Sequence, residues 1–340
     1  MKKRIVIAGA LLLVFAAASA APETVEKKMA KKAGKLFEKA MKAFQEKQVD
    51  QAIDLLNQVV VLEPGNAMVR HNLGVMLHQQ GLVDEAIASF AEAVKLDPGY
   101  QHSQKALRQA LFEAGRGAAN NQEFEKANGY LLKLMDLPRF GEDSEDVLAM
   151  ARYLIGQNYY QLKQYPQAQE YLELCRATEG LESENLDLYA NATYLVAMIH
   201  SIKKEYDAAN SHFGKYLDLY KTTEKKPEFV AKANYFIAVN LFQKLEEKLK
   251  KGEVAGMAEA AAEIIPYLEL AIADPIFSED AHVMLGNCHV YRKEYDLAVQ
   301  TYERLIAAGP QSAQLENYKA FLGELQKMKQ QQERKAKTKR

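Results

Sequence analysis

A spacing of twelve residues recurs six times along this 340-residue chain. Each time, a small residue precedes an alanine by twelve positions, and a large apolar residue follows that alanine four positions later. Because helices approach most closely where their side chains are small, the spacing predicts a repeated pair of packed helices. The six units are Ala40–Ala52–Leu56, Gly74–Ala86–Phe90, Gly115–Ala127–Leu131, Gly156–Ala168–Leu172, Ala197–Ala209–Phe213 and Gly286–Ala298–Tyr302.

The hydrophobic pattern around these units is helical throughout. Over residues 33–328 apolar side chains recur at i, i+3, i+4 and i+7, and no strand-like alternation occurs. Short breaks with proline or glycine end each helix. Ala52 to Ala86, and Pro64 to Pro98, are both 34 residues apart. The sequence therefore predicts one continuous all-α array of antiparallel helix hairpins, without an interdomain linker.

This pattern resembles the tetratricopeptide repeat, a 34-residue helix–turn–helix unit. The L-G-x-x-Y part of the repeat stands here as Leu73–Leu77, Ile155–Tyr159 and Leu285–His289, although its tryptophan is absent. The resemblance covers residues 33–312. It implies a right-handed solenoid of about seven repeats whose first helices line a concave groove.

Two units depart from the regular pattern. About seven extra residues near 101–107 predict a longer first helix in the third unit. The unit over residues 228–275 fits poorly. Its first helix is expected over Glu228–Lys250 and an insertion around Gly252–Glu263, and Pro266 is expected to interrupt its second helix.

The C-terminal end reads as a cap followed by a tail. Residues 313–328 predict a helix with one apolar stripe, which would cover the last repeat. Residues 329–340 are strongly basic. We expect a solvated tail there, with peripheral contact to an acidic partner or anionic lipid as the alternative.

The N-terminal end predicts export. A basic start, Lys2–Arg4, precedes the apolar run Ile5–Ala18, and Ala18-Ser19-Ala20 has the form that signal peptidase accepts. Residues 1–20 are therefore a predicted signal peptide, and residues 21–32 are the expected N-terminal segment of the mature chain. The apolar run falls short of the roughly 20 residues that span a membrane. The expected location is the periplasm, or the medium after secretion, with no transmembrane segment after cleavage.

Charge and cysteine content restrict the partners and the redox chemistry. The net charge of −1 gives no electrostatic reason to expect nucleic acid binding. The two cysteines, Cys175 and Cys288, lie 113 residues apart. Since a solenoid repeat touches only its neighbours, we expect two separate, buried, free thiols.

Motifs of catalysis and cofactor binding are missing from the sequence. It contains no glycine-rich phosphate loop, no G-x-S-x-G and no H-E-x-x-H. Two histidine pairs, His71/His78 and His282/His289, have a spacing of seven residues. That is about 10.5 Å along a helix, too far for one metal ion with bonds of about 2 Å. We expect no cofactor, no metal and no enzyme activity.

Aromatic residues mark a candidate binding surface on the first helices of the later repeats. The face away from the small-residue seam should be polar if it meets only water, yet it carries tyrosine, methionine, valine and phenylalanine. Such a surface is typical of protein-binding sites, and ordinary packing between helices is the alternative. The candidate groove residues are Tyr153, Gln157, Tyr160, Tyr194, Met198, Tyr235, Val239, Phe242, Asn287 and Tyr291.

These features together favour a binding protein over an enzyme. The expected function is an exported scaffold that holds a protein or peptide segment in the groove. A self-assembling subunit of an envelope or secretion assembly is one alternative, and an envelope enzyme with a cryptic site is another. Some proteins with this repeat hold a partner's C-terminal carboxylate through a set of lysine, asparagine and arginine side chains. That set is not recognisable on the early first helices here.

Overall fold

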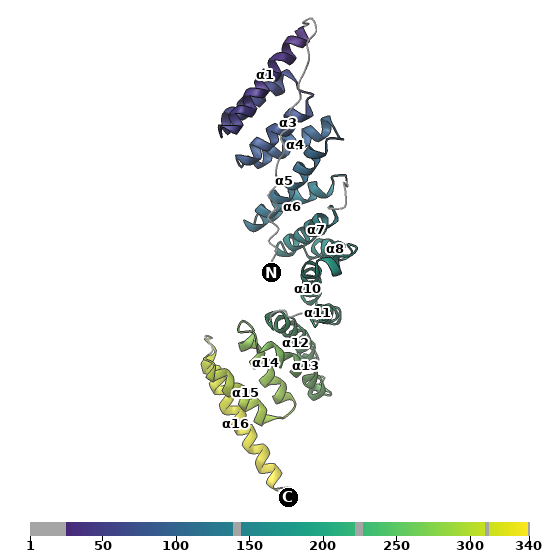
Figure 1. The fold of residues 1–340 in the computed structure, drawn as a ribbon. Coiled ribbons are helices and arrows are strands. Elements are labelled where there is room, and N and C mark those ends of the chain that lie inside the picture. Colours follow the sequence, from purple (N-terminus) through teal and green to yellow (C-terminus); the bar gives the residue numbers. More distant parts are fainter. Residues whose placement is uncertain (1–24, 139–143, 222–226, 310–312, 339–340) are drawn as a thin grey trace. The chain divides into compact units, whose positions relative to one another are not determined.

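The computed structural model describes residues 25–138, 144–221, 227–309 and 313–338. Within these ranges every regular element is an α-helix, which confirms the predicted all-α fold of helix hairpins (Figure 1). The chain forms two compact units, residues 1–144 and 145–340. We predicted one continuous array, in which the break at Leu137-Pro138 is a turn between repeats.

Unit 1 consists of three hairpins. Each first helix packs against the second helix that follows it, and the second helices of the first two hairpins pack against the hairpin that comes next. The lengthened first helix of the third hairpin is confirmed, since α5 has 20 residues against 13 in α3. The helices are α1 (Val25–Gln45), α2 (Val49–Leu62), α3 (Ala67–Gln79), α4 (Val83–Leu96), α5 (Gln101–Asn120) and α6 (Phe124–Met135).

Unit 2 continues the same construction. Helices α10, α12 and α14 pair with α11, α13 and α15, the successive hairpins contact one another, and α16 packs on α15. The helices are α7 (Ser144–Gln161), α8 (Tyr165–Arg176), α9 (Leu181–Glu184), α10 (Leu186–Ile202), α11 (Tyr206–Tyr220), α12 (Pro227–Lys250), α13 (Met257–Ala271), α14 (Ser278–Tyr291), α15 (Tyr295–Ala307) and α16 (Leu315–Thr338).

The small residue of a hairpin lies directly against the large apolar residue sixteen positions later. A Cβ atom added to Gly74 would lie 2.7 Å from the Phe90 ring, and one added to Gly156 would lie 2.7 Å from Leu172. Real carbon atoms do not approach so closely, so the missing side chain creates the space that the large residue fills. The predicted seam of small residues is confirmed. The large residue covers the small residue of its own hairpin and also reaches the next hairpin, since the Phe213 ring of α11 stacks on Phe236 of α12 with centroids 5.8 Å apart.

The tight turns inside the hairpins share one unusual backbone feature. Each has a residue with positive φ seven positions after the small seam residue, a conformation that costs side-chain-bearing residues energy. Only one of the six is glycine. The residues are Lys47 (φ 62°), Gly81 (φ 76°), Gln122 (φ 63°), Lys163 (φ 59°), Lys204 (φ 62°) and Lys293 (φ 60°).

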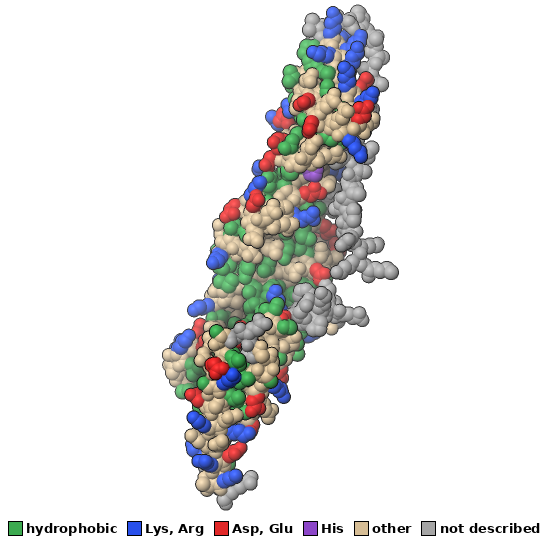
Figure 2. All heavy atoms as spheres, turned by 90° about the vertical axis from the view of Figure 1, so that its left-hand side faces the viewer, with side chains coloured by type: hydrophobic (Ala, Val, Ile, Leu, Met, Phe, Trp, Pro, Cys, Tyr) green, Lys and Arg blue, Asp and Glu red, His purple; other side chains and the backbone are tan. Residues whose placement is uncertain are grey.

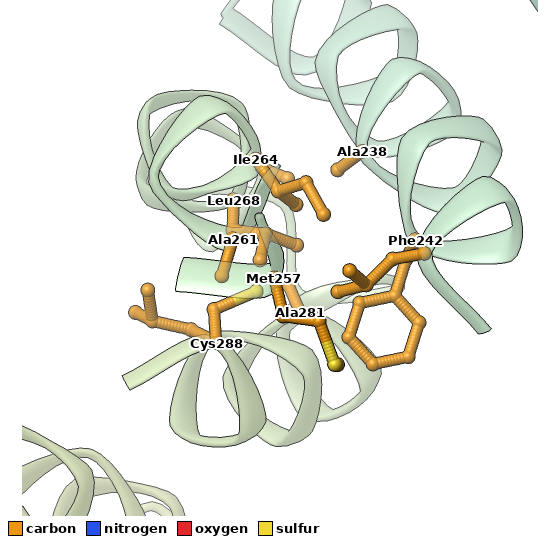
Figure 3. Packing of buried hydrophobic residues seen from close by; sticks show 11 residues of the cluster. Ala238, Phe242, Met257, Ala261, Ile264, Leu268, Ala281 and Cys288 are labelled. Carbon is orange, nitrogen blue, oxygen red and sulfur yellow. The ribbon is translucent and has the colours of Figure 1, made fainter. Parts of the chain in front are cut away.

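The irregular hairpin, α12 and α13, keeps the core of its neighbours despite its insertion. Helix α12 runs over Pro227–Lys250, close to the predicted 228–250, and residues 251–256 connect it to α13. Ala238 of α12, Ala261 of α13 and Cys288 of α14 lie in one buried cluster (Figure 3). The insertion therefore lengthens the connection without removing the hairpin from the stack.

Pro266 does not interrupt the second helix of this hairpin. It lies inside α13, so the prediction of a break was wrong. A proline removes one backbone hydrogen bond of a helix. Ile264 and Leu268, on either side of Pro266, are fully buried in the cluster shared with α12 and α14. The packing of these two side chains keeps the helix continuous although the proline has removed that hydrogen bond.

Both ends of the described chain are more helical than the sequence suggested. Helix α1 already begins at Val25, inside the segment 21–32 that was expected to precede the repeats. Helix α16 runs to Thr338, so the expected cap (313–328) and most of the expected basic tail (329–340) form one helix. The predicted signal peptide lies outside the described residues. Among the helices that are described, none has the length and apolar character to cross a membrane.

The two cysteines are free and fully buried, as predicted. Burial raises the pKa of the Cys288 thiol to about 12. Burial also raises the pKa of the Cys175 thiol to about 12, although the nearby Arg152 and Arg176 oppose the shift. Both thiols are thus protonated and unreactive in the folded protein.

Candidate protein-binding surface

The ten candidate groove residues all lie in unit 2, on its four successive first helices. These are α7, α10, α12 and α14. Nine of the ten side chains are half-buried, which leaves part of each open to a partner. Phe242 is the exception at 7 % exposure. It belongs to the core cluster of α12, α13 and α14, so its ring offers little to a partner, contrary to the prediction.

Tyr194 on α10 occupies the centre of an aromatic cluster. Its ring centroid lies 5.5 Å from those of Phe213 and Tyr216 on α11, and 6.1 Å from that of Phe236 on α12. The Lys232 ammonium group lies 4.9 Å from the same ring, a cation–π contact. Burial raises the pKa of the Tyr194 hydroxyl far above its usual value. Tyr194 therefore joins three helices, and only part of its surface is available for binding.

These contacts correct the geometry assumed from the sequence. The tyrosines were expected opposite the small-residue seam, but Tyr194 precedes Ala197 by three positions. Residues three apart on a helix share a face, so Tyr194 contacts the same second helix that Ala197 packs against. The same spacing separates Tyr153 from Gly156. The tyrosines flank the seam, and the candidate surface borders the core directly.

Tyr235 links α12 to the start of α14. Its ring stacks on Phe277, with centroids 4.4 Å apart and an angle of 19° between the planes. Its hydroxyl donates a hydrogen bond to Asp280 at 3.2 Å. Burial, and then the Asp280 carboxylate, raise the pKa of Tyr235 to about 12. The two contacts fix the ring in one orientation, which lowers the entropy that binding would cost.

Tyr160 and Tyr291 lie toward the other ends of their helices. The Tyr160 ring meets Tyr165, at the start of α8, edge to face with centroids 5.9 Å apart. The Tyr291 ring lies 6.4 Å from Phe242. Tyr153 packs on the cluster that contains Cys175, and burial raises the pKa of its hydroxyl. Each ring thus combines a packed side with a partly open one.

The remaining candidate residues add aliphatic and amide groups. Met198 and Val239 are half-buried beside the tyrosines. Gln157 and Asn287 supply amides, and the Asn287 oxygen accepts a hydrogen bond from Tyr302 at 3.4 Å. Rings and aliphatic groups can bury a partner's apolar side chains, while amides can pair with its backbone. We call the nine candidate residues other than Phe242 the first-helix surface.

The structure also contains an open cavity that the sequence did not indicate. Its volume is about 470 Å³, and it lies between α11, α12 and α13. Leu217, Leu241 and Leu245 are among its apolar lining residues, and a 2.6 Å ion pair between Lys244 and Asp207 lies beside them. In the sequence, the nearest hint of this cavity was the poor fit of residues 228–275 to the repeat pattern. The long connection between α12 and α13 replaces the tight turn of the other hairpins.

The two histidine pairs noted in the sequence take separate partners in the structure. Each imidazole faces a different oxygen, so neither pair converges on one point. In the part of the chain that is described, no three side chains of the metal-binding types converge either. The contacts are His71 with Ser103 (3.1 Å), His78 with Glu113 (3.4 Å), His282 with the Ser278 carbonyl (2.7 Å) and His289 with Glu294 (2.9 Å).

Family comparisons agree with the repeat pattern. Three models of the tetratricopeptide repeat match residues 37–101, 150–175 and 280–312. These segments correspond to hairpins in both units, so the chain contains tetratricopeptide repeats and the resemblance drawn from the seam spacing is confirmed. Repeats of this kind generally mediate contacts between proteins and are typically not enzymes.

Among solved structures, similar chains include three bacterial proteins. A fragment of MamA from Desulfovibrio magneticus RS-1 is 17 % identical, with a TM-score of 0.33, covering 58 % of this chain and 99 % of that one. PilF of Pseudomonas aeruginosa is 14 % identical, with a TM-score of 0.35 and coverages of 79 % and 99 %. A tetratricopeptide repeat protein from Parabacteroides merdae is 17 % identical, with a TM-score of 0.32 and coverages of 88 % and 98 %. No curated protein matches the chain.

Proposed function

We propose that this chain is an exported protein-binding scaffold that holds a segment of another protein on the first-helix surface of unit 2. One observation carries the proposal. Four successive first helices place partly open tyrosine, aliphatic and amide side chains along the same flank of the stack. The neighbouring helices hold those side chains in place, so little ordering is needed when a partner binds.

The chemistry of the surface favours a partner segment with apolar or aromatic anchors. Lys232 and Asp280 are charged groups beside it, and they already contact Tyr194 and Tyr235. A strongly acidic or basic segment would therefore find few opposite charges there. An extended or helical segment that buries apolar side chains against the tyrosines fits the surface better.

Site-specific photo-crosslinking tests the location of the surface. A photoreactive phenylalanine analogue would replace Tyr160 or Gln157 on α7 in cells. As a control it would replace Glu170, which is exposed on the second helix α8. We expect the α7 positions to capture one partner protein that the α8 position does not capture. Crosslinks that form only from Glu170, or equally from all three positions, would contradict the proposal.

Comparing the affinity of the parent protein with that of a variant then gives the contribution of one ring to the free energy of binding. With the captured partner in hand, Tyr160→Ala should weaken binding by about 2 kcal/mol, roughly thirtyfold, because rings of this kind dominate binding interfaces. Light scattering during size-exclusion chromatography, run over a range of concentrations, would separate this scaffold from a self-assembling subunit. A mass that grows with concentration would favour the subunit.

The export part of the proposal rests on the first twenty residues. Intact-mass measurement of the protein recovered from outside the cytoplasm should show a chain that begins at Ala21. A recovered chain that still contains Lys2 would contradict cleavage. Recovery of the protein only from the cytoplasm would contradict export.

A further inference from the structure

The three tight hairpin turns of unit 2 all carry a lysine in the same strained position. Lys163, Lys204 and Lys293 have φ of 59°, 62° and 60°. Glycine adopts this conformation without steric cost, and it does stand at Gly81 in unit 1. Unit 2 thus has a cation at each of these turns where backbone geometry alone would favour glycine.

These lysines lie along one edge of unit 2. Each occupies the turn from a first helix to a second helix, and the hairpins pack one after another. In a stack of antiparallel hairpins, equivalent turns lie on the same edge. All three side chains are exposed, and none forms an ion pair with any described residue. The result is a row of free ammonium groups, one for each tight turn.

The longer connection between α12 and α13 adds to the same edge. Helix α12 continues twelve residues beyond Ala238, which is buried in one cluster with Ala261 of α13, whereas α10 continues five residues beyond Ala197. The connection after α12 therefore projects by about 10 Å more. Lys250, at the end of α12, and Lys251, in the connection, are both exposed. Val254 in the same connection is 70 % exposed. A projecting loop with two cations and an open apolar side chain therefore extends from the row.

The basic end of α16 reaches this edge as well. Lys329 forms a 2.5 Å ion pair with Asp296, and the Gln332 amide donates a hydrogen bond to the carbonyl of Lys293 at 3.1 Å. The helix then continues with Arg334, Lys335 and Lys337, which form no ion pairs in the described structure. Figure 2 shows several Lys and Arg side chains at this end of the chain, with Asp and Glu side chains among them.

Two of the carboxylates near the edge are engaged, while Glu333 in the basic end of α16 remains exposed. Glu205 contacts His200 at 2.5 Å, and Glu294 contacts His289 and Arg292 at 2.9 and 2.7 Å. Glu253 in the α12–α13 connection has no such partner. The whole chain has a net charge of −1, so acidic residues elsewhere balance the basic character of this edge and of the end of α16.

We propose that this edge, formed by Lys163, Lys204, Lys250, Lys251, Lys293 and the basic end of α16, docks unit 2 on an anionic phospholipid surface. Separate ammonium groups on flexible stems suit a broad field of negative charge better than one shaped ligand. The exposed Val254, three residues after Lys251, favours lipid over an acidic protein, because it can enter the headgroup region. The partner-binding surface on the first helices would remain free.

Vesicle co-sedimentation tests the proposal. The protein would comprise residues 21–340, because the apolar run over 5–18 would itself enter a bilayer. We expect binding to vesicles of phosphatidylcholine with about 30 mol % phosphatidylglycerol, and little binding to phosphatidylcholine alone. Binding should weaken strongly between 50 and 300 mM salt, about as screening predicts.

The decisive variant combines Lys204→Gly, Lys251→Gln and Lys293→Gly. Glycine suits the two strained positions, so folding is preserved while three charges are lost. At about fivefold per lysine, binding to the anionic vesicles should fall roughly a hundredfold. The control variant removes three charges from unit 1, by Lys47→Gly, Lys105→Gln and Lys133→Gln, and should bind nearly as the parent does. Equal losses in both variants, no binding to anionic vesicles, or retention by polyglutamate in place of vesicles would overturn the proposal.

Discussion

Gly115 on α5 and Leu131 on α6 approach so closely that a Cβ atom at position 115 would lie 2.6 Å from the leucine Cγ. Two residues further along the same helix, a Cβ atom at Gly117 would meet nothing within 4 Å. The two glycines therefore offer a matched pair, in which one substitution tests the packing of the seam and the other tests helix propensity alone.

Gly115→Ala should destabilise unit 1 by roughly 1–3 kcal/mol, because the added methyl group forces α5 and α6 apart. Gly117→Ala should raise the free energy of unfolding by about 0.5–1 kcal/mol, since alanine is the better helix former. Urea unfolding followed by circular dichroism measures both. Equal effects of the two variants would show that the seam does not control the packing.

The aromatic cluster around Tyr194 predicts that the ring of this residue stabilises the fold much more than its hydroxyl does. Tyr194→Ala removes a ring that contacts α11 and α12, and should cost about 3 kcal/mol of stability. Tyr194→Phe should cost less than about 1 kcal/mol, because the hydroxyl makes no hydrogen bond to a described residue. Thermal unfolding of the two variants checks this. A stable Tyr194→Ala protein would mean that the ring is not part of the packing between the helices.

The strained turns predict a stabilising substitution. Lys163→Gly should increase stability by about 0.5–1 kcal/mol, because glycine adopts positive φ without steric conflict. Gly81→Ala should decrease it by about 1 kcal/mol, and the effect is purely conformational because a Cβ there meets no atom within 4 Å. Chemical denaturation reports both. If Lys163→Gly is destabilising, the lysine must make a contact that the turn geometry does not reveal.

His71 predicts a loss of stability in mild acid. The imidazole is 2 % exposed, and burial, with a smaller contribution from His102, lowers its pKa from 6.5 to about 4. The folded state therefore binds this proton less readily than the unfolded chain does. Its contribution is fully present above pH 6.5 and is lost as the pH falls toward 4. The total is roughly 2–3 kcal/mol.

Unfolding measured from pH 7 to 4 on the parent and on His71→Gln isolates this contribution from that of the carboxylates. The difference between the two proteins should change through this pH window and stay constant above it. Parallel pH profiles would show that His71 is protonated in the folded state or that its environment is open to water.

The sequence by itself determined the hairpin and its seam. Gly74, Gly156 and Gly286 could be recognised because close helix packing demands a small residue at one fixed position, and that demand recurs with a constant spacing. Even the ends of α12, the helix before the insertion, could be predicted closely, because helical periodicity depends only on neighbouring residues. The free, buried state of Cys175 and Cys288 followed from the order of the repeats, because a solenoid repeat touches only its neighbours.

Tertiary structure decided what lies around each side chain. Tyr194 was assigned to the right helix but to the wrong direction, because its face depends on where α11 and α12 pack. Pro266 remained helical because buried neighbours hold α13 together, and no local rule reports that energy. The row of lysines at Lys163, Lys204 and Lys293 and the end of α16 come together only when the hairpins stack. Residues about forty positions apart, such as Lys293 and Gln332, become neighbours through packing, which the order of residues along the chain does not encode locally.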